Sequence, residues 1–179
     1  MTRQPRIGGK KVLALLVVCL LAPSTTHAQK IGASLEVYPA GAIVTARYSR
    51  DMSDNSRLLI HLGMNATDRR DWGEHEIEEG AGFGAGIAQH RYFSDSRVGP
   101  WLGIRADVWA QTIKWQDQGR RGETNVTVIQ PTARAGWTLP AFGAQFDFSV
   151  SLGAEFNVKT TGESVRQGAI VLVGIVYDF

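Results

Sequence analysis

Apolar and polar side chains alternate, residue by residue, along most of this 179-residue chain. The clearest stretch runs from 144 to 156, where one face would carry Phe146, Phe148, Val150, Leu152, Ala154 and Phe156. A repeat of two residues places every second side chain on the same face of a β-strand. Helical spacing is hard to find, and no run after residue 28 approaches 18 apolar residues, so the chain is predicted to be all-β.

Eight such segments follow one another, and each is interpreted as one strand: 31–38, 42–50, 56–67, 81–93, 99–115, 125–139, 144–156 and 168–179. Most of them are near or above the roughly 9–11 residues that a tilted strand needs to cross a bilayer. Short links at 51–55, 94–97 and 140–143 alternate with longer polar links at 68–79, 116–124 and 157–167. Membrane barrels show this asymmetry, with short periplasmic turns and longer outer loops. The first link, 39–41, is an exception, because it should be an outer loop and is short.

The first 28 residues have the order of a secretory signal peptide: a basic start, an apolar run from 12 to 21, and a polar end at Ala28. We expect cleavage there, so that residues 29–179 form the mature domain. The removed segment carries four basic and no acidic residues, so the formal charge of +2 falls by 4 to −2. No basic run remains to suggest nucleic acid as a partner. The only cysteine, Cys19, leaves with the signal, so no disulfide or cysteine-bound metal is expected.

Two closed barrels fit alternating strands, and they differ in polarity. A soluble barrel puts its apolar face inward around a ligand, whereas a membrane barrel turns that face to lipid. Aromatic residues fall in the apolar phase near both expected rims, as in the aromatic girdles of membrane barrels. They are Tyr48, Phe93, Trp137, Phe146 and Tyr177 toward the periplasm and Phe83 and Phe156 toward the outside.

The last segment alternates through Val171, Val173, Ile175 and Tyr177 to a final aromatic residue, Phe179. This ending resembles the C-terminal signature of bacterial outer-membrane proteins, and the pattern of the chain resembles small OmpA/OmpX-type barrels over the whole mature length. The resemblance implies an eight-stranded antiparallel transmembrane up-and-down β-barrel in the Gram-negative cell outer membrane. It also implies outer-membrane lipids and lipopolysaccharide as surroundings and the barrel-assembly machinery as a partner during insertion. A monomer is expected.

Two positions disturb the pattern. Gln89 and Arg91 are polar although they lie in the outward phase of segment 81–93, so we expect either a bulge near Ala88 that turns Tyr92 outward or a position at the membrane interface. Pro131 lacks a backbone donor and predicts another bulge or an irregular pairing.

Charges of both signs share the inward phase, and unpaired charges in an enclosed interior are costly. We therefore expect Arg47, Arg105 and Arg134 to pair with carboxylates from the set Glu36, Asp107, Asp147 and Glu155. An eight-stranded interior is just wide enough for side chains to fill. Trp109 and Gln111 would add bulk, Gly82, Gly84 and Gly86 would make room, and no open pore is expected.

Catalytic and metal-binding residues are hard to find in this sequence. His90 and Ser94 are four residues apart at a predicted turn, and His61 has no serine two residues away, so no nucleophile and base are expected to meet. Residues 72–79 gather His75 with four glutamates, which could hold a divalent cation but are more simply read as a solvated acidic loop. No catalytic, cofactor-binding or metal-binding residue is therefore assigned, and no cofactor.

The sequence favours a non-enzymatic barrel with a structural, adhesion or partner-binding role through loops 68–79, 116–124 and 157–167. Two alternatives remain: an outer-membrane enzyme that modifies lipid A or lipopolysaccharide, and a soluble periplasmic barrel that binds a ligand.

Overall fold

The structure is a computed structural model that describes residues 29–70 and 72–179. Eight strands account for most of these residues: β1 (Gln29–Tyr38), β2 (Gly41–Ser53), β3 (Ser56–Asp68), β4 (Ile77–Tyr92), β5 (Gly99–Asp117), β6 (Arg120–Ala141), β7 (Ala144–Thr161) and β8 (Gly168–Asp178). The expected signal peptide, 1–28, lies outside the described residues. No helix that could cross a bilayer occurs among the residues described.

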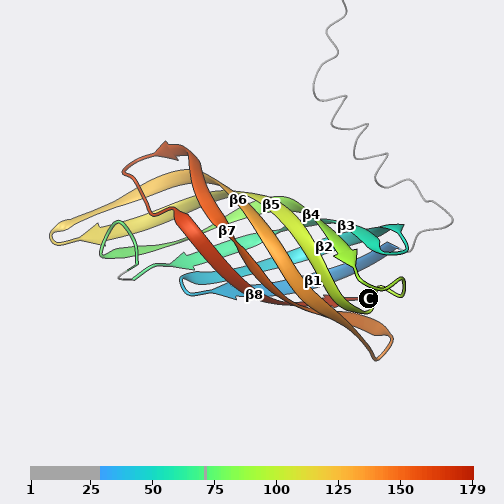
Figure 1. Ribbon diagram of the computed structural model, residues 1–179. Coiled ribbons are helices and arrows are strands. Elements are labelled where there is room, and N and C mark those ends of the chain that lie inside the picture. The colour runs from blue at the N-terminus through green and yellow to red at the C-terminus, as the bar shows by residue number, and fades with distance from the viewer. Residues whose placement is uncertain (1–28, 71) are drawn as a thin grey trace, which may run out of the picture.

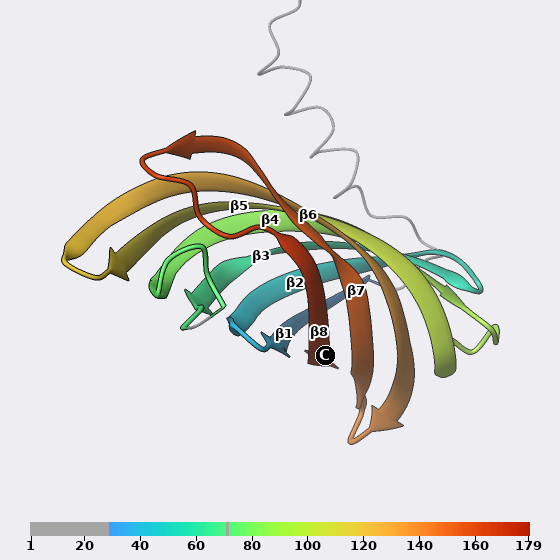
Figure 2. The same ribbon diagram turned by 60° about the vertical axis from the view of Figure 1, so that its left-hand side comes forward.

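Each strand pairs antiparallel with the next one in the chain, and β8 pairs with β1 to close the ring. The strands are strongly tilted, and the ring is seen from two sides in Figures 1 and 2. Closure uses the six pairs from Gly32–Asp178 to Val37–Val173. The predicted eight-stranded up-and-down barrel is therefore confirmed.

The two ends of the barrel are unequal. The end that carries the C-terminus has short turns, and the opposite end carries the long β5–β6 hairpin, which reaches furthest in Figure 1. Two of the predicted long loops were wrong in extent, because only 118–119 and 162–167 lie outside strands. Beyond the membrane both faces of a strand contact water, so the alternation fades there and the strand ends resemble loops in the sequence.

The short first link is explained by a short first hairpin. β1 has 10 residues and turns at 39–40, whereas β5 and β6 have 19 and 22 residues. β8 extends past its last pair with β1, Val37–Val173, by the five residues Gly168–Leu172. Residues 69–70 and 72–76 lie at the same end of the molecule as the first turn (Figure 1).

The barrel has the inverted polarity expected of a membrane barrel. Large apolar side chains cover the outside, among them Leu62, Ile104, Leu152 and Val173, each more than half exposed. The polar residues predicted to face inward are buried: Glu36, Arg47, Arg105, Asp107, Gln111, Arg134, Asp147 and Glu155. The aromatic residues of the expected girdles lie outward, with Tyr48 and Phe146 half-buried and the other five exposed.

The two irregular positions have different outcomes. The bulge near Ala88 was wrong, because β4 pairs without a register shift on both sides and Tyr92 is buried inside. Gln89 and Arg91 instead lie exposed on the outer wall, toward the end of the barrel that has the short turns. The irregular pairing at Pro131 is confirmed toward β7, where Gln130 and Pro131 have no paired residue, whereas both pair regularly with β5.

Candidate functional site: an ion-paired interior beneath a cap of loops

Charged side chains fill the middle of the barrel and neutralise one another. The Glu36 carboxylate accepts hydrogen bonds from Arg105 Nη1 and, at 2.7 Å, from Arg134 Nη2. Arg105 Nε also donates to Asp107 at 2.6 Å. Arg47 Nη2 donates to Asp147 at 2.9 Å. The three arginines therefore pair as predicted, each with a carboxylate that is buried.

Further ion pairs lie toward the end of the barrel that carries the C-terminus, and sequence reasoning missed them. Arg47 also contacts Asp178 at 2.5 Å, and Arg57 donates to Asp51 at 2.7 Å. Asp51 was assigned to a turn, although β2 continues through it to Ser53. The sequence did contain a signal for these pairs, because Arg57 and Asp178 share the inward phase of their strands with the other charged residues.

Glycines on β4 make the room that this layer needs. A side chain at Gly86 would come within 1.9 Å of the Asp107 carboxylate and 2.4 Å of His61 Nε2. With no side chain there, His61 Nε2 and Asp107 Oδ1 meet at 2.5 Å. The remaining cavity at this level is about 10 Å³, which is room for about one water molecule.

An apolar cluster closes the barrel above the charged layer. It consists of the buried side chains Ile43, Trp109, Ile113, Trp115, Val126, Val128, Val165, Ile170 and Leu172. Trp109 is completely buried and its indole N–H donates to Gln130 Oε1 at 2.7 Å. Sequence reasoning placed Trp109 inside but did not predict the rest of the cluster. An apolar layer inside a membrane barrel departs from the simple rule of a polar interior.

Glu78, buried at the start of β4, fastens two outer loops together. Its carboxylate accepts the backbone N–H of Glu74 at 2.8 Å and of His75 at 3.3 Å, both in loop 69–76. It also accepts the backbone N–H of Arg166 in loop 162–167 at 3.3 Å. A hydrogen bond to a buried charged group contributes about 1.5–3 kcal/mol. Glu78 was expected in a solvated acidic loop, and that interpretation was wrong for this residue.

Arg69 also links the residues that hold these two loops, from the barrel side. It is buried, and its guanidinium contacts Glu155 at 2.7 Å, Glu78 at 3.5 Å and the backbone oxygen of Arg166 at 2.8 Å. Glu155 belongs to the set of carboxylates predicted to contain the partners of the three central arginines, and in the structure it pairs with Arg69. Arg69 follows directly after β3 and no sequence pattern marked it, because its partners come from β7 and a distant loop.

His75 joins the same loop to the long hairpin. Its ring stacks on Trp115 with centroids 4.4 Å apart. Nδ1 lies 2.8 Å from Asp117 Oδ2, and Nε2 lies 3.0 Å from the backbone oxygen of Ser164. A neutral imidazole has one N–H donor, so only protonated His75 donates to both acceptors. We call residues 69–70 and 72–76, loop 162–167 and the β5–β6 tip, joined in this way, the cap.

The surroundings of His75 favour its charged form. Partial burial by itself lowers the pKa of His75, but the hydrogen bonds to Asp117 and the Ser164 oxygen and the charges of Asp117 and Glu78 raise that pKa overall, above 6.5. The hydrogen bond from His75 and one from the Glu76 N–H lower the pKa of Asp117 below 3.8. Arg120, whose guanidinium lies 5.6 Å from the Trp115 ring, pairs with Glu163.

The cap should therefore weaken as pH rises. A raised pKa in the folded form stabilises that form below the ordinary pKa, and the contribution is lost as pH passes through the raised value. The lowered pKa of Asp117 stabilises the folded form at higher pH, and this contribution is lost as pH falls through the lowered value. The contact between His75 and Asp117 is therefore strongest between the pKa of Asp117 and that of His75. We expect a nuclear magnetic resonance titration of the His75 ring to give a midpoint above 6.5 and Asp117→Asn to lower it. A midpoint that the substitution leaves unchanged would contradict this assignment.

The residues considered for catalysis and metal binding do not come together. His90 is buried and stacks on Trp101 at 3.7 Å, while Ser94 bonds to Ser96 and to the backbone of Val98 in the turn. Within 29–70 and 72–179, no three His, Cys, Asp or Glu side chains are arranged to hold a metal ion. The carboxylates of 72–79 diverge, since Glu78 points inward and Glu79 is exposed.

Comparisons with known proteins establish the fold and nothing narrower. No family model and no curated protein matches the chain. The N-terminal β-barrel domain of Pseudomonas aeruginosa OprF has a TM-score of 0.54 at 16% identity, over 84% of this chain and 96% of that chain. Ail, the attachment invasion locus protein of Yersinia pestis, was solved with the heparin analogue sucrose octasulfate. It has a TM-score of 0.45 at 10% identity, over 86% of this chain and 97% of that one.

Neisserial surface protein A has a TM-score of 0.45 at 11% identity, over 86% of this chain and 97% of that chain. The likeness to the OprF domain confirms, at the level of the fold, the expected resemblance to small eight-stranded outer-membrane barrels.

Proposed function

We propose that this chain is an integral protein of the Gram-negative outer membrane that presents the cap as an extracellular binding surface, on a barrel closed to solutes. The cap is the observation that supports the proposal. Flexible loops would not need a buried carboxylate, a buried arginine and a histidine stack to hold them together. Fixing a surface in advance lowers the ordering cost of binding a partner.

The exposed surface of the cap suits polar contact. Trp72 is 60% exposed, and aromatic residues are frequent anchors in protein interfaces. Charged residues of both signs are exposed on the same outer strands and loops: Arg70, Glu74, Glu76, Lys114, Arg120, Arg121, Glu123 and Arg166. The closed interior supports a binding role over transport, because the charged layer and the apolar cluster lie one above the other.

The membrane part of the proposal is tested by fractionation together with a heat-modifiability gel. The chain should co-sediment with outer membranes and change mobility on boiling. Recovery in the soluble periplasmic fraction would support the alternative ligand-binding barrel. Release of fatty acid or sugar from labelled lipopolysaccharide would support the alternative enzyme, and we expect no turnover. In planar bilayers the purified barrel should carry no steady ion current.

The rigid cap is tested by Glu78→Gln, which keeps the shape of the side chain and removes its charge. Hydrogen exchange at the amides of Glu74 and His75 should become about tenfold faster or more, because each loses a bond to a charged acceptor. Exchange in the strands should not change. Glu79→Gln, at the next, exposed position, is the matched control.

Equal exchange in the two variants would show that Glu78 does not hold the cap. The binding role is then tested on cells that display either variant, by measuring adhesion to surfaces coated with sulfated polysaccharide or with matrix protein. Adhesion that Glu78→Gln weakens and Glu79→Gln preserves supports the proposal. Absence of adhesion to every surface would favour a purely structural role.

A further inference from the structure

The lipid-facing wall carries a groove on the side of β4 to β7. Its volume is about 740 Å³, and small residues form its floor. The strand register explains the hollow: Ala106 on β5 pairs with Pro131 on β6, and Ala133 on β6 pairs with Leu152 on β7. Neighbouring Gly153 and Ala154 continue the row of small residues.

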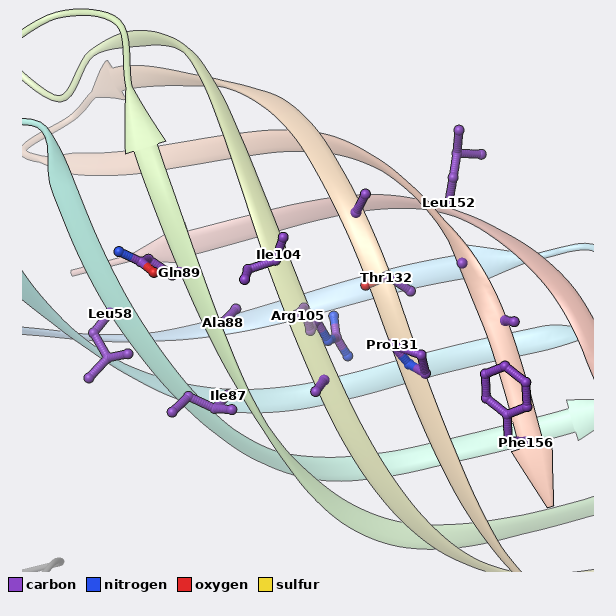
Figure 3. A pocket seen from close by; sticks show the side chains of 14 residues that line it. Leu58, Ile87, Ala88, Gln89, Ile104, Arg105, Pro131, Thr132, Leu152 and Phe156 are labelled. Carbon is purple, nitrogen blue, oxygen red and sulfur yellow. The ribbon is translucent and has the colours of Figure 1, made fainter. Parts of the chain in front are cut away.

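Large apolar residues form the walls at both ends of this row. Figure 3 shows Leu58 and Ile87 at one end, Leu152 and Phe156 at the other, and Pro131 between them. The groove therefore runs across the strands and not along them. Pro131 has no backbone N–H, and the pairing of β6 with β7 lapses at Gln130 and Pro131, on the floor of the groove.

The end of the groove at β3 and β4 also carries polar side chains beside Leu58 and Ile87. Gln89 lines it on β4, is exposed, and donates to Ser56 Oγ at 3.3 Å. Arg91 lies two residues further along the same outward face and pairs in register with Ser56 and Leu102. Arg91 is exposed, and its guanidinium contacts no carboxylate within 29–70 and 72–179. A cation beside a hydrocarbon-lined groove complements an anionic amphiphile.

The position of Arg91 indicates from which leaflet of the membrane a bound lipid would come. It lies one residue before the end of β4, next to the short turn that connects β4 to β5 at the periplasmic end. The cap is at the opposite end. Arginine near the ends of spanning elements commonly reaches the headgroup region. A lipid bound here would therefore have its phosphate at the periplasmic surface, where phospholipids rather than lipopolysaccharide are expected in an outer membrane.

We propose that the groove binds an acyl chain of one anionic phospholipid, whose phosphate contacts Arg91 and Gln89. This inference rests on the proposed membrane location. The row of small residues accommodates the chain, Ile104 and Phe156 flank it, and the guanidinium supplies the charge that distinguishes an anionic headgroup.

Native mass spectrometry of the barrel purified from membranes in detergent tests this proposal. Added phosphatidylglycerol should give one bound lipid per chain and should bind more tightly than phosphatidylcholine. Arg91→Gln should weaken phosphatidylglycerol binding about tenfold and remove the preference. Ala133→Trp should abolish binding of both lipids by filling the groove. Ala46→Trp, an outward alanine on β2 away from the groove, is the matched control and should bind normally.

The outcomes separate this inference from the proposed function. Every variant is first checked for folding by heat modifiability and for membrane location by fractionation. A chain that does not reach the membrane overturns the proposed function itself. A folded membrane barrel that binds no phospholipid, or that binds equally well after Ala133→Trp, overturns only the lipid site. A dimer lost in Ala133→Trp, or lipopolysaccharide bound in place of phospholipid, also overturns it.

Discussion

Replacing Glu36 with alanine should destabilise the barrel by about 3–5 kcal/mol, because it leaves buried arginines without their shared carboxylate. Glu36 is completely buried and is the only carboxylate that contacts Arg134 among the residues described. Arg134 would keep hydrogen bonds to the hydroxyls of Ser149 and Ser151 and a contact with the Trp101 ring, but no carboxylate partner among the residues described. Arg105 would keep Asp107. Urea unfolding of the purified barrel in lipid vesicles, followed by tryptophan fluorescence, measures the loss.

Two further variants distinguish pairing from simple loss of volume. Glu79→Ala removes an exposed glutamate and should change the unfolding free energy by no more than about 0.5 kcal/mol. The double substitution Glu36→Gln with Arg134→Met removes both charges of one pair and should recover a large part of the stability, since an apolar replacement of a buried pair is often neutral. A double variant no more stable than Glu36→Ala would refute the pairing argument.

Alternation was sufficient to predict the wall of the barrel, because water is excluded from one face of each strand only within the membrane. Segments such as 144–156 therefore showed the strand directly. Beyond the membrane both faces of a strand contact water, so a strand there shows no alternation in its sequence. Residues 116–117 and 120–124 were expected to be loop for this reason, although they belong to β5 and β6.

The cap was beyond sequence reasoning because its contacts join distant parts of the chain. Glu78 meets the amide of Arg166, which is 88 residues away, and Arg69 meets Glu155 across 86 residues. The residues 72–79 looked like a solvated acidic loop, since composition does not reveal which carboxylate points inward. The balance of charges in the inward phase did predict the ion pairs of the three central arginines, but it did not predict that Glu155 pairs with Arg69.

The apolar cluster predicts the second large effect. Trp109→Ala should lower the unfolding free energy by about 3–5 kcal/mol, as for other large buried aromatic residues. Trp109 is completely buried, and Gly84 on the neighbouring strand leaves the space that its ring fills, since a side chain there would lie 2.3 Å from Trp109 Cε3. Trp137→Ala, at a lipid-facing position that is 51% exposed, is the matched control and should cost much less.

Trp109→Phe separates the ring from its hydrogen bond. It keeps most of the apolar volume but leaves Gln130 Oε1 without its donor, so the expected loss is about 1–3 kcal/mol. None of these substitutions should make the barrel conduct, because the layer of Glu36, Arg105 and Arg134 still fills the interior at a different level. Planar bilayer recordings of Trp109→Ala decide this point: a steady current would mean that the apolar cluster alone seals the barrel and that the ion pairs serve only stability.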